Sequence, residues 1–384
     1  LTLFRDQKKG SASTTDLSEK NIKNVVEAAN SIAKLTASDE YAGLADAALM
    51  ASTPMDLDLY HPWDVDVEQA IGLAKTCEAT GMAVDPRISN SDGVGVSTHQ
   101  DYALYANSHG FMGDIQGTHH GITCILIAKD KSSMECDYYY DEKRDAKALL
   151  SPKVIAQRAA DRTIKRLNPQ KLSTRVAPVI FTPELSRGLI GQFLSAISGG
   201  TLYRKASFLL DGLGKPVFSP AINIFEQPFL KNAAASAWFD ADGVSTSEKY
   251  FVKNGELVNY CLGNYSAKRL GLKTTGNADG VHNLTVDSTS GDLACLLKTM
   301  DKGLLVTDAL GHGANILTGD YSSGASGFWV ENGEIQYPVA EITVAANLKE
   351  MFLNIVAVGN DVDRRSNIQL GSMLFEQMTI AGGA

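Results

Sequence analysis

The stretch from Ala177 to Gly200, APVIFTPELSRGLIGQFLSAISGG, constrains the fold more than any other part of the chain. Residues 178–181 predict a short buried strand. Thr182-Pro183-Glu184 then supplies a capping hydroxyl, a first-turn proline and a carboxylate near the positive end of a helix. Apolar side chains recur every three or four positions after it: Leu185, Leu189, Ile190, Phe193, Leu194 and Ile197. This spacing predicts a helix buried on most of its circumference, ending at Gly199-Gly200, where glycine tolerates a left-handed conformation.

A rigid helix after a buried strand is a good support for metal ligands, because side chains on successive turns point the same way. This helix offers no such set of ligands. The chain also has no Gly-x-Ser-x-Gly motif for a serine nucleophile and no Gly-x-x-x-x-Gly-Lys-Ser/Thr loop for a nucleotide. The absence of these motifs argues against a serine hydrolase with a Gly-x-Ser-x-Gly nucleophile and against a P-loop nucleotide-binding enzyme.

Four long and unusual segments carry a family resemblance: KLSTRVAPVIF from Lys171, LYRKASFLLD from Leu202, LTGDYSSGASGFWVENGEIQYPVAEI from Leu317 and VGNDVDRRSNIQ from Val358. Through them the chain resembles the TldD/PmbA family, specifically its PmbA branch, also called TldE. The similarity extends from about Arg5 to the C-terminal Ala-Gly-Gly-Ala.

The resemblance implies that the metal-binding motif of the TldD branch has been lost. That branch is a metallopeptidase with a His-Glu-x-x-x-His helix and a cysteine as third ligand. By the flanking Gly188-Leu189-x-Gly191 pattern, the two histidine positions fall on Thr182 and Arg187, the glutamate position on Pro183 and the cysteine position on Leu370. Proline and leucine offer no side-chain donor, and arginine stays protonated. Glu184 lies one place from the family's general base, and we interpret it as a helix N-terminal carboxylate.

The net charge of −9 argues against a nucleic-acid groove, which needs a surplus of lysine and arginine. The nearest basic run, Lys165-Arg166 with Lys171 and Arg175, is predicted to be the solvated end of a helix. We expect no direct binding to nucleic acid. An old label for the family, modulator of DNA gyrase, would then describe an action through protein contacts or an indirect one.

Five scattered cysteines without a CxxC pair predict neither a disulfide framework nor a zinc knuckle. Cys77 and Cys295, in apolar helical patterns, and Cys124, in an apolar strand, are expected to be buried packing residues. This usage favours the cytoplasm. No apolar run approaches the roughly 18 residues of a membrane span. Because the first residue is leucine and the chain opens inside a strand, we expect further sequence before it.

The overall pattern predicts an α+β architecture with two domains, 1–168 and 169–384, divided at Asn168-Pro169. Helices are expected from Ser18, from Asp66 to Gly81 and from Ser151-Pro152 to before Asn168. Between them, period-two patterning predicts an antiparallel meander of five strands. Their ranges are 93–98, 102–107, 111–118, 122–128 and 134–140.

The second domain is predicted to be β-rich with one buried helix. Asn254-Gly255 and Asn332-Gly333 favour hairpin turns that need positive φ at both residues. Short helices are expected at 266–270 and 292–300. Strands are expected at 304–307, 327–330, 334–337 and 341–345.

The histidines offer only weak alternatives for a metal site. His99, His109, His119 and His120 belong to the meander. The adjacent pair, His119-His120, should point to opposite faces of a strand. His61 and His282 are predicted to be surface residues. His312, in Gly311-His312-Gly313, is a candidate for a substrate cleft, but no second ligand or partnered carboxylate accompanies it.

Two charged clusters complete the candidate residues. Asp361, Asp363, Arg364 and Arg365 lie near the C-terminus, and Asp320-Tyr321 lies in a glycine-rich segment. Each is typical of a turn or an interface ion pair. The family resemblance implies that they border the same cleft as the helix. The possible cleft therefore consists of Glu184, His312, Asp320, Tyr321, Arg364 and Arg365.

Our first hypothesis is a PmbA/TldE-like subunit that pairs with a TldD-like metallopeptidase to cleave peptides or unfolded polypeptides. It would carry no catalytic residue and no cofactor, with zinc in the partner, and would form a homodimer when isolated. Two alternatives stay open. One is an active metallopeptidase with an unrecognised histidine site, and the other is a non-proteolytic interaction protein acting on a gyrase or toxin system.

Overall fold

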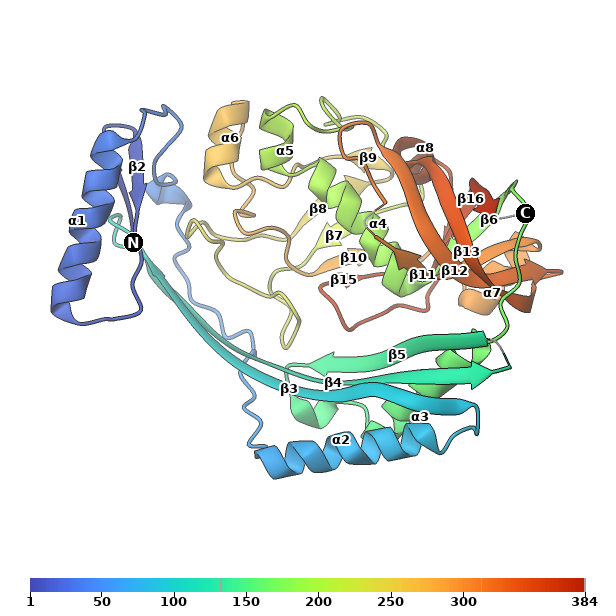
Figure 1. The fold of residues 1–384 in the computed structure, drawn as a ribbon. Coiled ribbons are helices and arrows are strands. Elements are labelled where there is room, and N and C mark those ends of the chain that lie inside the picture. The colour runs from blue at the N-terminus through green and yellow to red at the C-terminus, as the bar shows by residue number, and fades with distance from the viewer. Residues whose placement is uncertain (132, 312, 383–384) are drawn as a thin grey trace.

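The computed structural model describes residues 1–131, 133–311 and 313–382, which form a mixed α+β fold (Figure 1). The described elements fall into three groups. A hairpin and a helix come first, a curved three-stranded sheet with two helices follows, and a closed barrel with a smaller sheet completes the chain. The predicted α+β class is confirmed.

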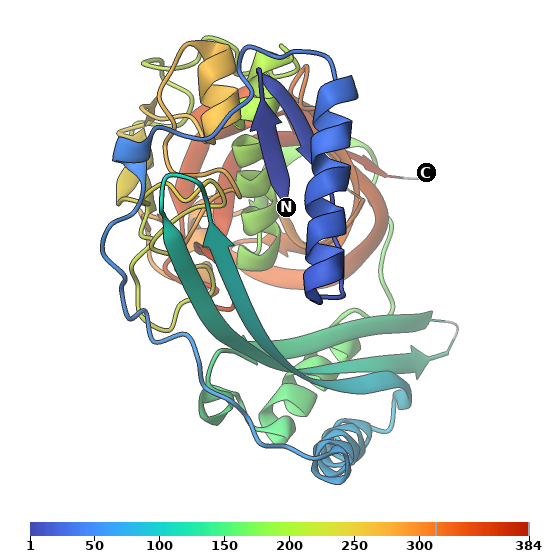
Figure 2. The same cartoon turned by 90° about the vertical axis from the view of Figure 1, so that its left-hand side faces the viewer.

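The N-terminal group consists of the hairpin β1 (Thr2–Arg5) and β2 (Lys8–Ser11) with helix α1 (Glu19–Leu35). Figure 2 shows the helix alongside the two strands. Ala29 and Ala33 are fully buried against Gly10, where an added Cβ would lie 2.0 Å from the Ala29 carbonyl oxygen. The helix begins after Ser18 as predicted, although the Ser18 side chain makes no capping hydrogen bond.

The meander contains three strands instead of the predicted five: β3 (Ile88–Ala106), β4 (Met112–Asp130) and β5 (Ser133–Lys143). The breaks expected near residues 99–101 and 119–121 do not exist, because the ladder continues with His99 opposite His119 and Thr98 opposite His120. The polar residues of β3 lie on an exposed strand and therefore do not interrupt its pairing. Figures 1 and 2 show the long hairpin curving towards the N-terminal group.

Two helices cover this sheet: α2 (Val67–Met82) and α3 (Pro152–Lys165). Both predicted caps are confirmed, since Asp66 accepts a hydrogen bond from the Gln69 N–H in a capping box and Ser151 accepts one from the Val154 N–H. The helices and β4 enclose an apolar core of small side chains on α3 and branched ones on β4. This core fixes the orientation of α3, whose last turns reach the candidate site.

A closed barrel of five strands forms the centre of the C-terminal part: β6 (Arg175–Phe181), β11 (Gly303–Leu310), β12 (Asp320–Glu331), β13 (Glu334–Asn347) and β16 (Met373–Gly382). The pairing of β13 with β16 closes it, and β14 (Ile355–Val358) adds an antiparallel strand beside β16. Strands β6 and β11 are parallel, and the remaining pairs are antiparallel. The sequence patterns predict a β-rich region but not this closure.

Strand β13 corrects the prediction of two separate strands at 334–337 and 341–345. Glu341 has φ of 54°, and the register with β12 shifts between Ala325 and Gly327. A single strand with a β-bulge therefore replaces the expected break. By contrast, the hairpin turns at Asn254-Gly255 and Asn332-Gly333 are confirmed, with positive φ at all four residues.

A second sheet has the order β15 (Ile368–Gln369), β10 (Leu284–Val286), β7 (Ile224–Glu226), β8 (Lys249–Lys253) and β9 (Glu256–Leu257). Four short helices complete the described C-terminal part: α5 (Gly199–Tyr203), α6 (Asn264–Leu270), α7 (Leu293–Met300) and α8 (Leu348–Leu353). The helices expected at 266–270 and 292–300 correspond to α6 and α7.

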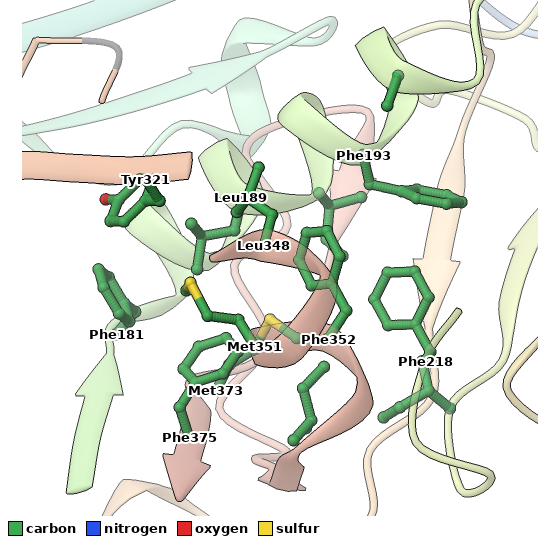
Figure 3. Close-up of a cluster of buried hydrophobic side chains, with 14 of the residues drawn as sticks. Phe181, Leu189, Phe193, Phe218, Tyr321, Leu348, Met351, Phe352, Met373 and Phe375 are labelled. Carbon is green, nitrogen blue, oxygen red and sulfur yellow. The ribbon is translucent and has the colours of Figure 1, made fainter. Parts of the chain in front are cut away.

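Helix α4 (Pro183–Ala196) is the predicted central helix, and it packs into the largest apolar core. Figure 3 shows Leu189 and Phe193 of α4 facing side chains from α8 and from the loop around Phe218. Phe193 meets Phe218 edge to face, with ring centroids 4.9 Å apart. The core therefore holds α4 rigidly with respect to β6.

The end of α4 differs from the prediction. It ends at Ala196 with Ile197 as cap, and Gly199-Gly200 starts α5 without positive φ. Gly199 is instead needed for close approach, because its Cβ would lie 2.1 Å from the Ser266 hydroxyl oxygen of α6. Packing, and not a left-handed cap, explains this glycine.

The cysteine predictions are partly corrected. Cys77 and Cys124 are fully buried as expected, but Cys295 is exposed on the outer side of α7. All five thiols are free. No helix within the described ranges is both long and apolar enough to cross a membrane.

Candidate functional site

A cavity of about 460 Å³ lies between the three-stranded sheet of β3, β4 and β5, with its helix α3, and the start of α4. The loop at 361–365 forms another of its walls. The cavity brings together Glu184, Arg364 and Arg365 from the predicted cleft, together with Thr182 and Pro183 of the degenerate motif. Residues from three separate parts of the chain therefore meet at the N-terminus of α4.

Glu184 is held by two arginines, one from α3 and one from the loop at 361–365. Arg162 on α3 donates from one Nη1 to both carboxylate oxygens, at 3.0 and 3.1 Å. Arg365 donates from Nη2 to Glu184 Oε1 at 2.6 Å and from Nη1 to the Tyr140 carbonyl oxygen at 3.0 Å. Glu184 thus belongs to an ion-pair network that ties α3 and β5 to the barrel side. Its interpretation as a simple helix N-terminal carboxylate is incomplete.

Asp363 extends this ion-pair network to Arg187, which the family resemblance places at the second histidine position. Arg365 Nε donates to Asp363 Oδ1 at 2.9 Å, and Arg187 Nη1 lies 3.9 Å from Asp363 Oδ2. Burial raises the pKa of Asp363, but hydrogen bonds from Arg365 and the two positive charges outweigh it and leave the pKa below its ordinary value. The Asp363 N–H also donates to the Leu370 carbonyl oxygen at 3.2 Å. Arg187 and Leu370 therefore both adjoin Asp363.

The degenerate positions offer no suitable ligand set for zinc. The Thr182 hydroxyl, expected to cap α4, is buried and makes no hydrogen bond. Arg187 is a cation in an ion pair, and Leu370 is a fully buried apolar side chain. Zinc in proteins is bound by thiolate, imidazole and carboxylate. Elsewhere in the described residues, no group of three His, Cys, Asp or Glu side chains could hold a metal ion.

Arg166 corrects the prediction of a solvated basic end on α3. Its side chain is 15% exposed and lies between carboxylates from β5 and β11. Nη2 donates to Asp308 at 3.0 Å, and Glu135 and Asp137 lie at 3.6 and 3.5 Å. The end of this helix faces the barrel, so this part of the basic run forms interface ion pairs.

Two of the other predicted cleft residues, Asp320 and Tyr321, do not line this cavity. Asp320 is exposed and bonds to Thr318 and Asn347. Tyr321 is buried against Phe181 in the barrel core, which explains why the pKa of its phenol is raised by burial. His312 lies outside the described residues.

The histidine predictions are confirmed for the adjacent pair and wrong for His282. His120 is fully buried and bonds to Thr98, whereas His119 is 41% exposed and lies 3.5 Å from Glu142. His282 is buried instead of lying on the surface. Its ring lies 3.3 Å from the fully buried Glu226, and its backbone N–H donates to the same carboxylate.

That buried carboxylate also receives a hydrogen bond from Lys249. Burial raises the pKa of Glu226, but the contacts from His282 and Lys249 outweigh it and lower the pKa. The cluster lies in the second sheet and does not line the cavity at α4.

Sequence reasoning missed several residues that line the cavity, among them Tyr139, Arg158 and Arg162. The available signal was the run Tyr138-Tyr139-Tyr140, which ends a meander strand, followed by arginines on one helix. Aromatic side chains and arginines at the end of one sheet indicate a binding surface only when their facing direction is known. The structure supplies that direction.

Comparison with known proteins identifies the family. The family model described as the PmbA/TldA metallopeptidase C-terminal domain matches residues 174–382, and that of the PmbA/TldA metallopeptidase central domain matches residues 60–167. The chain belongs to the PmbA/TldD family. The resemblance inferred from the four sequence segments is confirmed.

Individual relatives place the chain among PmbA proteins. A metalloprotease PmbA homolog of Haemophilus influenzae is 48% identical over 383 residues, which cover 100% of this chain and 85% of the relative. The metalloprotease PmbA of Escherichia coli O157:H7 is 46% identical over 382 residues, with the same coverage of 100% and 85%. Both are similar to the chain over its whole length.

A crystal structure from Bacteroides thetaiotaomicron shares this PmbA/TldD fold. Its name proposes a modulator of DNA gyrase. It superposes with a TM-score of 0.93 at 28% identity, covering 100% of this chain and 87% of that one.

Proposed function

We propose that this chain is the PmbA-type (TldE) subunit of a TldD–TldE type metalloprotease acting on peptides or unfolded polypeptides. In this proposal it binds no catalytic zinc and does not itself catalyse hydrolysis. Zinc is held by a TldD-like partner, and the chain works in the cytoplasm. In isolation it forms a homodimer, since closed two-fold dimers are the commonest assembly of soluble chains.

The main support is the chemistry at the three degenerate positions. A hydroxyl, a guanidinium and an isobutyl group stand where the related metallopeptidases have two histidines and a cysteine. The Arg187 guanidinium also brings a positive charge next to Asp363, which opposes binding of a divalent cation there. This positive charge supports the proposal of a subunit without catalytic zinc.

The nearest candidate for a general base is also engaged. A general base needs a carboxylate oxygen that can accept a proton from water within hydrogen-bond reach. Both oxygens of Glu184 already accept hydrogen bonds from guanidinium groups. Because both oxygens are engaged in ion pairs with Arg162 and Arg365, Glu184 fits a structural role better than proton transfer.

The proposal leaves a role in substrate handling. The cavity at α4 opens beside β5, and β3 forms an edge of the three-stranded sheet. Extended peptides can pair with exposed strand edges through main-chain hydrogen bonds. We assign this chain a role as a wall of the substrate chamber, next to a catalytic centre in the partner.

The Bacteroides structure is named as a modulator of DNA gyrase. This proposal agrees with such a role only if the protein acts through contacts with other proteins and not by binding DNA. The net charge of −9 gives no support for direct DNA binding. A protease subunit can affect a gyrase or toxin system by degrading one of its components. Direct binding to gyrase without proteolysis is the competing outcome.

The test is peptidase activity on an unfolded polypeptide such as reduced casein. It is measured for this chain, for a TldD-like partner and for their mixture. The proposal predicts no cleavage by this chain alone and chelator-sensitive cleavage in the mixture. Cleavage by this chain alone would establish an active enzyme. Complex formation with gyrase, together with inactivity in the mixture, would establish the interaction protein.

A further inference from the structure

The charges that line the cavity at α4 are unequally satisfied. Its carboxylates all have partners within the protein. Asp141 accepts from Lys143 at 2.8 Å and from the Leu150 N–H at 2.9 Å. Asp361 accepts from the Ser372 N–H at 2.9 Å and from its hydroxyl at 2.6 Å. Glu184 and Asp363 form the ion pairs described above. No lining carboxylate is therefore left without a partner to bind a ligand cation.

Two lining arginines, Arg158 and Arg364, have no carboxylate partner among the described residues. Neither forms an ion pair with a carboxylate of the described residues, and both are exposed. Arg158 projects from α3 and Arg364 from the loop after β14, so they reach the cavity from different walls. The lining holds five lysine and arginine side chains and four carboxylates, so it carries an excess of positive charge, although the whole chain has a net charge of −9.

Arg158 is also held in place before any ligand binds. Its Nη1 donates to the Tyr139 hydroxyl, and its guanidinium carbon lies 5.1 Å from the centroid of the Tyr139 ring. Arg365 lies 5.0 Å from the same centroid. Tyr139 thus orders Arg158 while leaving its other N–H donors free. Ordering in advance lowers the entropy lost on binding.

We propose that Arg158 and Arg364 form a subsite for a carboxylate group of the peptide substrate. Guanidinium groups match carboxylates in charge and in the spacing of their donors. The inference rests on the proposed function, since it assumes that peptides enter this cavity. The carboxylate is either the C-terminus of the peptide or an acidic side chain, and both present the same chemistry.

The experiment compares short labelled peptides of glycine, serine and alanine by fluorescence anisotropy. One pair differs in a free or amidated C-terminus, and the other pair, both amidated, differs in a central glutamate or glutamine. Each is titrated into the wild-type chain and into the Arg158→Gln, Arg364→Gln and double variants. Lys153→Gln is the matched control, because it removes an exposed cation from the same helix outside the cavity.

We expect the carboxylate peptide of at least one pair to bind roughly tenfold more tightly than its neutral counterpart, the size typical of one charge-assisted hydrogen bond. The pair that shows the preference identifies the source of the carboxylate. The double variant should lose the preference, and Lys153→Gln should keep it. Displacement of the carboxylate peptides by inorganic phosphate at equal concentration would overturn the assignment to a peptide group.

Peptidase activity of this chain mixed with a TldD-like partner distinguishes a failure of the subsite from a failure of the proposed function. Equal binding of all four peptides, with cleavage of casein by the mixture, would overturn the subsite and leave the proposed function standing. Absence of both peptide binding and cleavage by the mixture would overturn both. A preference that persists in the double variant would place the carboxylate elsewhere.

Discussion

At Glu184, one carboxylate joins arginines that are distant in the sequence. Its side chain is 17% exposed, and that of Arg365 is 11% exposed. Breaking a partly buried pair leaves charged groups without compensation. We predict that Glu184→Gln lowers the free energy of unfolding by about 1–3 kcal/mol, measured by urea denaturation.

The control for this prediction is Glu19→Gln in the solvent-exposed pair with Lys23 on α1, whose side chains are 85% and 70% exposed. It should change the free energy of unfolding by less than about 0.5 kcal/mol. Equal effects of the two substitutions would contradict a structural role for the network at Glu184.

Asp240 provides a pH-dependent prediction. It is 1% exposed, and burial raises its pKa from 3.8 to about 6, although backbone N–H groups donate to it. A carboxyl group whose pKa is higher in the folded state destabilises the fold once it ionises. Its cost is absent below the unfolded pKa and fully present above the folded pKa.

We therefore compare Asp240→Asn with the wild type by urea denaturation across this range. The difference in free energy of unfolding, variant minus wild type, should rise by on the order of 3 kcal/mol between about pH 4 and pH 7. A constant offset from the lost hydrogen bond does not affect this slope. A pH-independent difference would show that Asp240 ionises normally.

At this scale the family resemblance predicts which positions lack metal ligands, but not what the residues at those positions contact. Thr182, Arg187 and Leu370 follow from motif positions alone. Arg162 and Arg365 lie 22 and 181 residues from Glu184, so their convergence depends on tertiary packing. The burial of His282 was likewise hidden, because its partner Glu226 lies 56 residues away.

At the scale of elements, the tip of the β3–β4 hairpin is anchored to the C-terminal part. Phe111 is 8% exposed and packs on Trp238 and Phe239, with ring centroids 6.0 and 5.3 Å away. The Trp238 indole N–H donates to the Asp114 carbonyl oxygen at 3.3 Å. This aromatic contact joins an otherwise extended hairpin to the loops around 238.

We predict that Phe111→Ala frees the hairpin tip and costs about 3 kcal/mol. Amide hydrogen exchange at residues 104–114 should accelerate, because local opening no longer breaks the aromatic cluster. Met112→Ala, next in sequence and 70% exposed, is the matched control and should leave exchange unchanged. Unchanged exchange in Phe111→Ala would mean that the tip is held by other contacts.

Local patterns predicted element starts better than element ends. The caps at Asp66 and Ser151 depend on neighbouring residues, and both hairpin turns depend on the Asn-Gly pair itself. The end of α4 was misassigned because Gly199 is required by its contact with α6, not by its own φ. Strand β3 is predicted as two shorter strands because the exposed polar residues at 99–101 resemble turn residues.

For the whole molecule, closure of the barrel was beyond sequence reasoning. Strand β6 pairs with β11 and β16, whose residues lie more than a hundred positions later. Periodicity identifies strands but not such distant partners. The family resemblance supplied the relation to a metallopeptidase family, while the structure supplied the side-chain contacts of Thr182, Arg187 and Leu370.

The most direct test of the central claim is the zinc content of this chain, purified without chelators and dialysed after exposure to excess zinc. Mass spectrometry of the metal, with a TldD-like protein treated identically, gives the comparison. We predict close to one zinc per TldD-like chain and almost none in this chain, because Thr182, Arg187 and Leu370 provide no ligand set. Stoichiometric zinc in this chain would contradict its assignment as the zinc-free subunit.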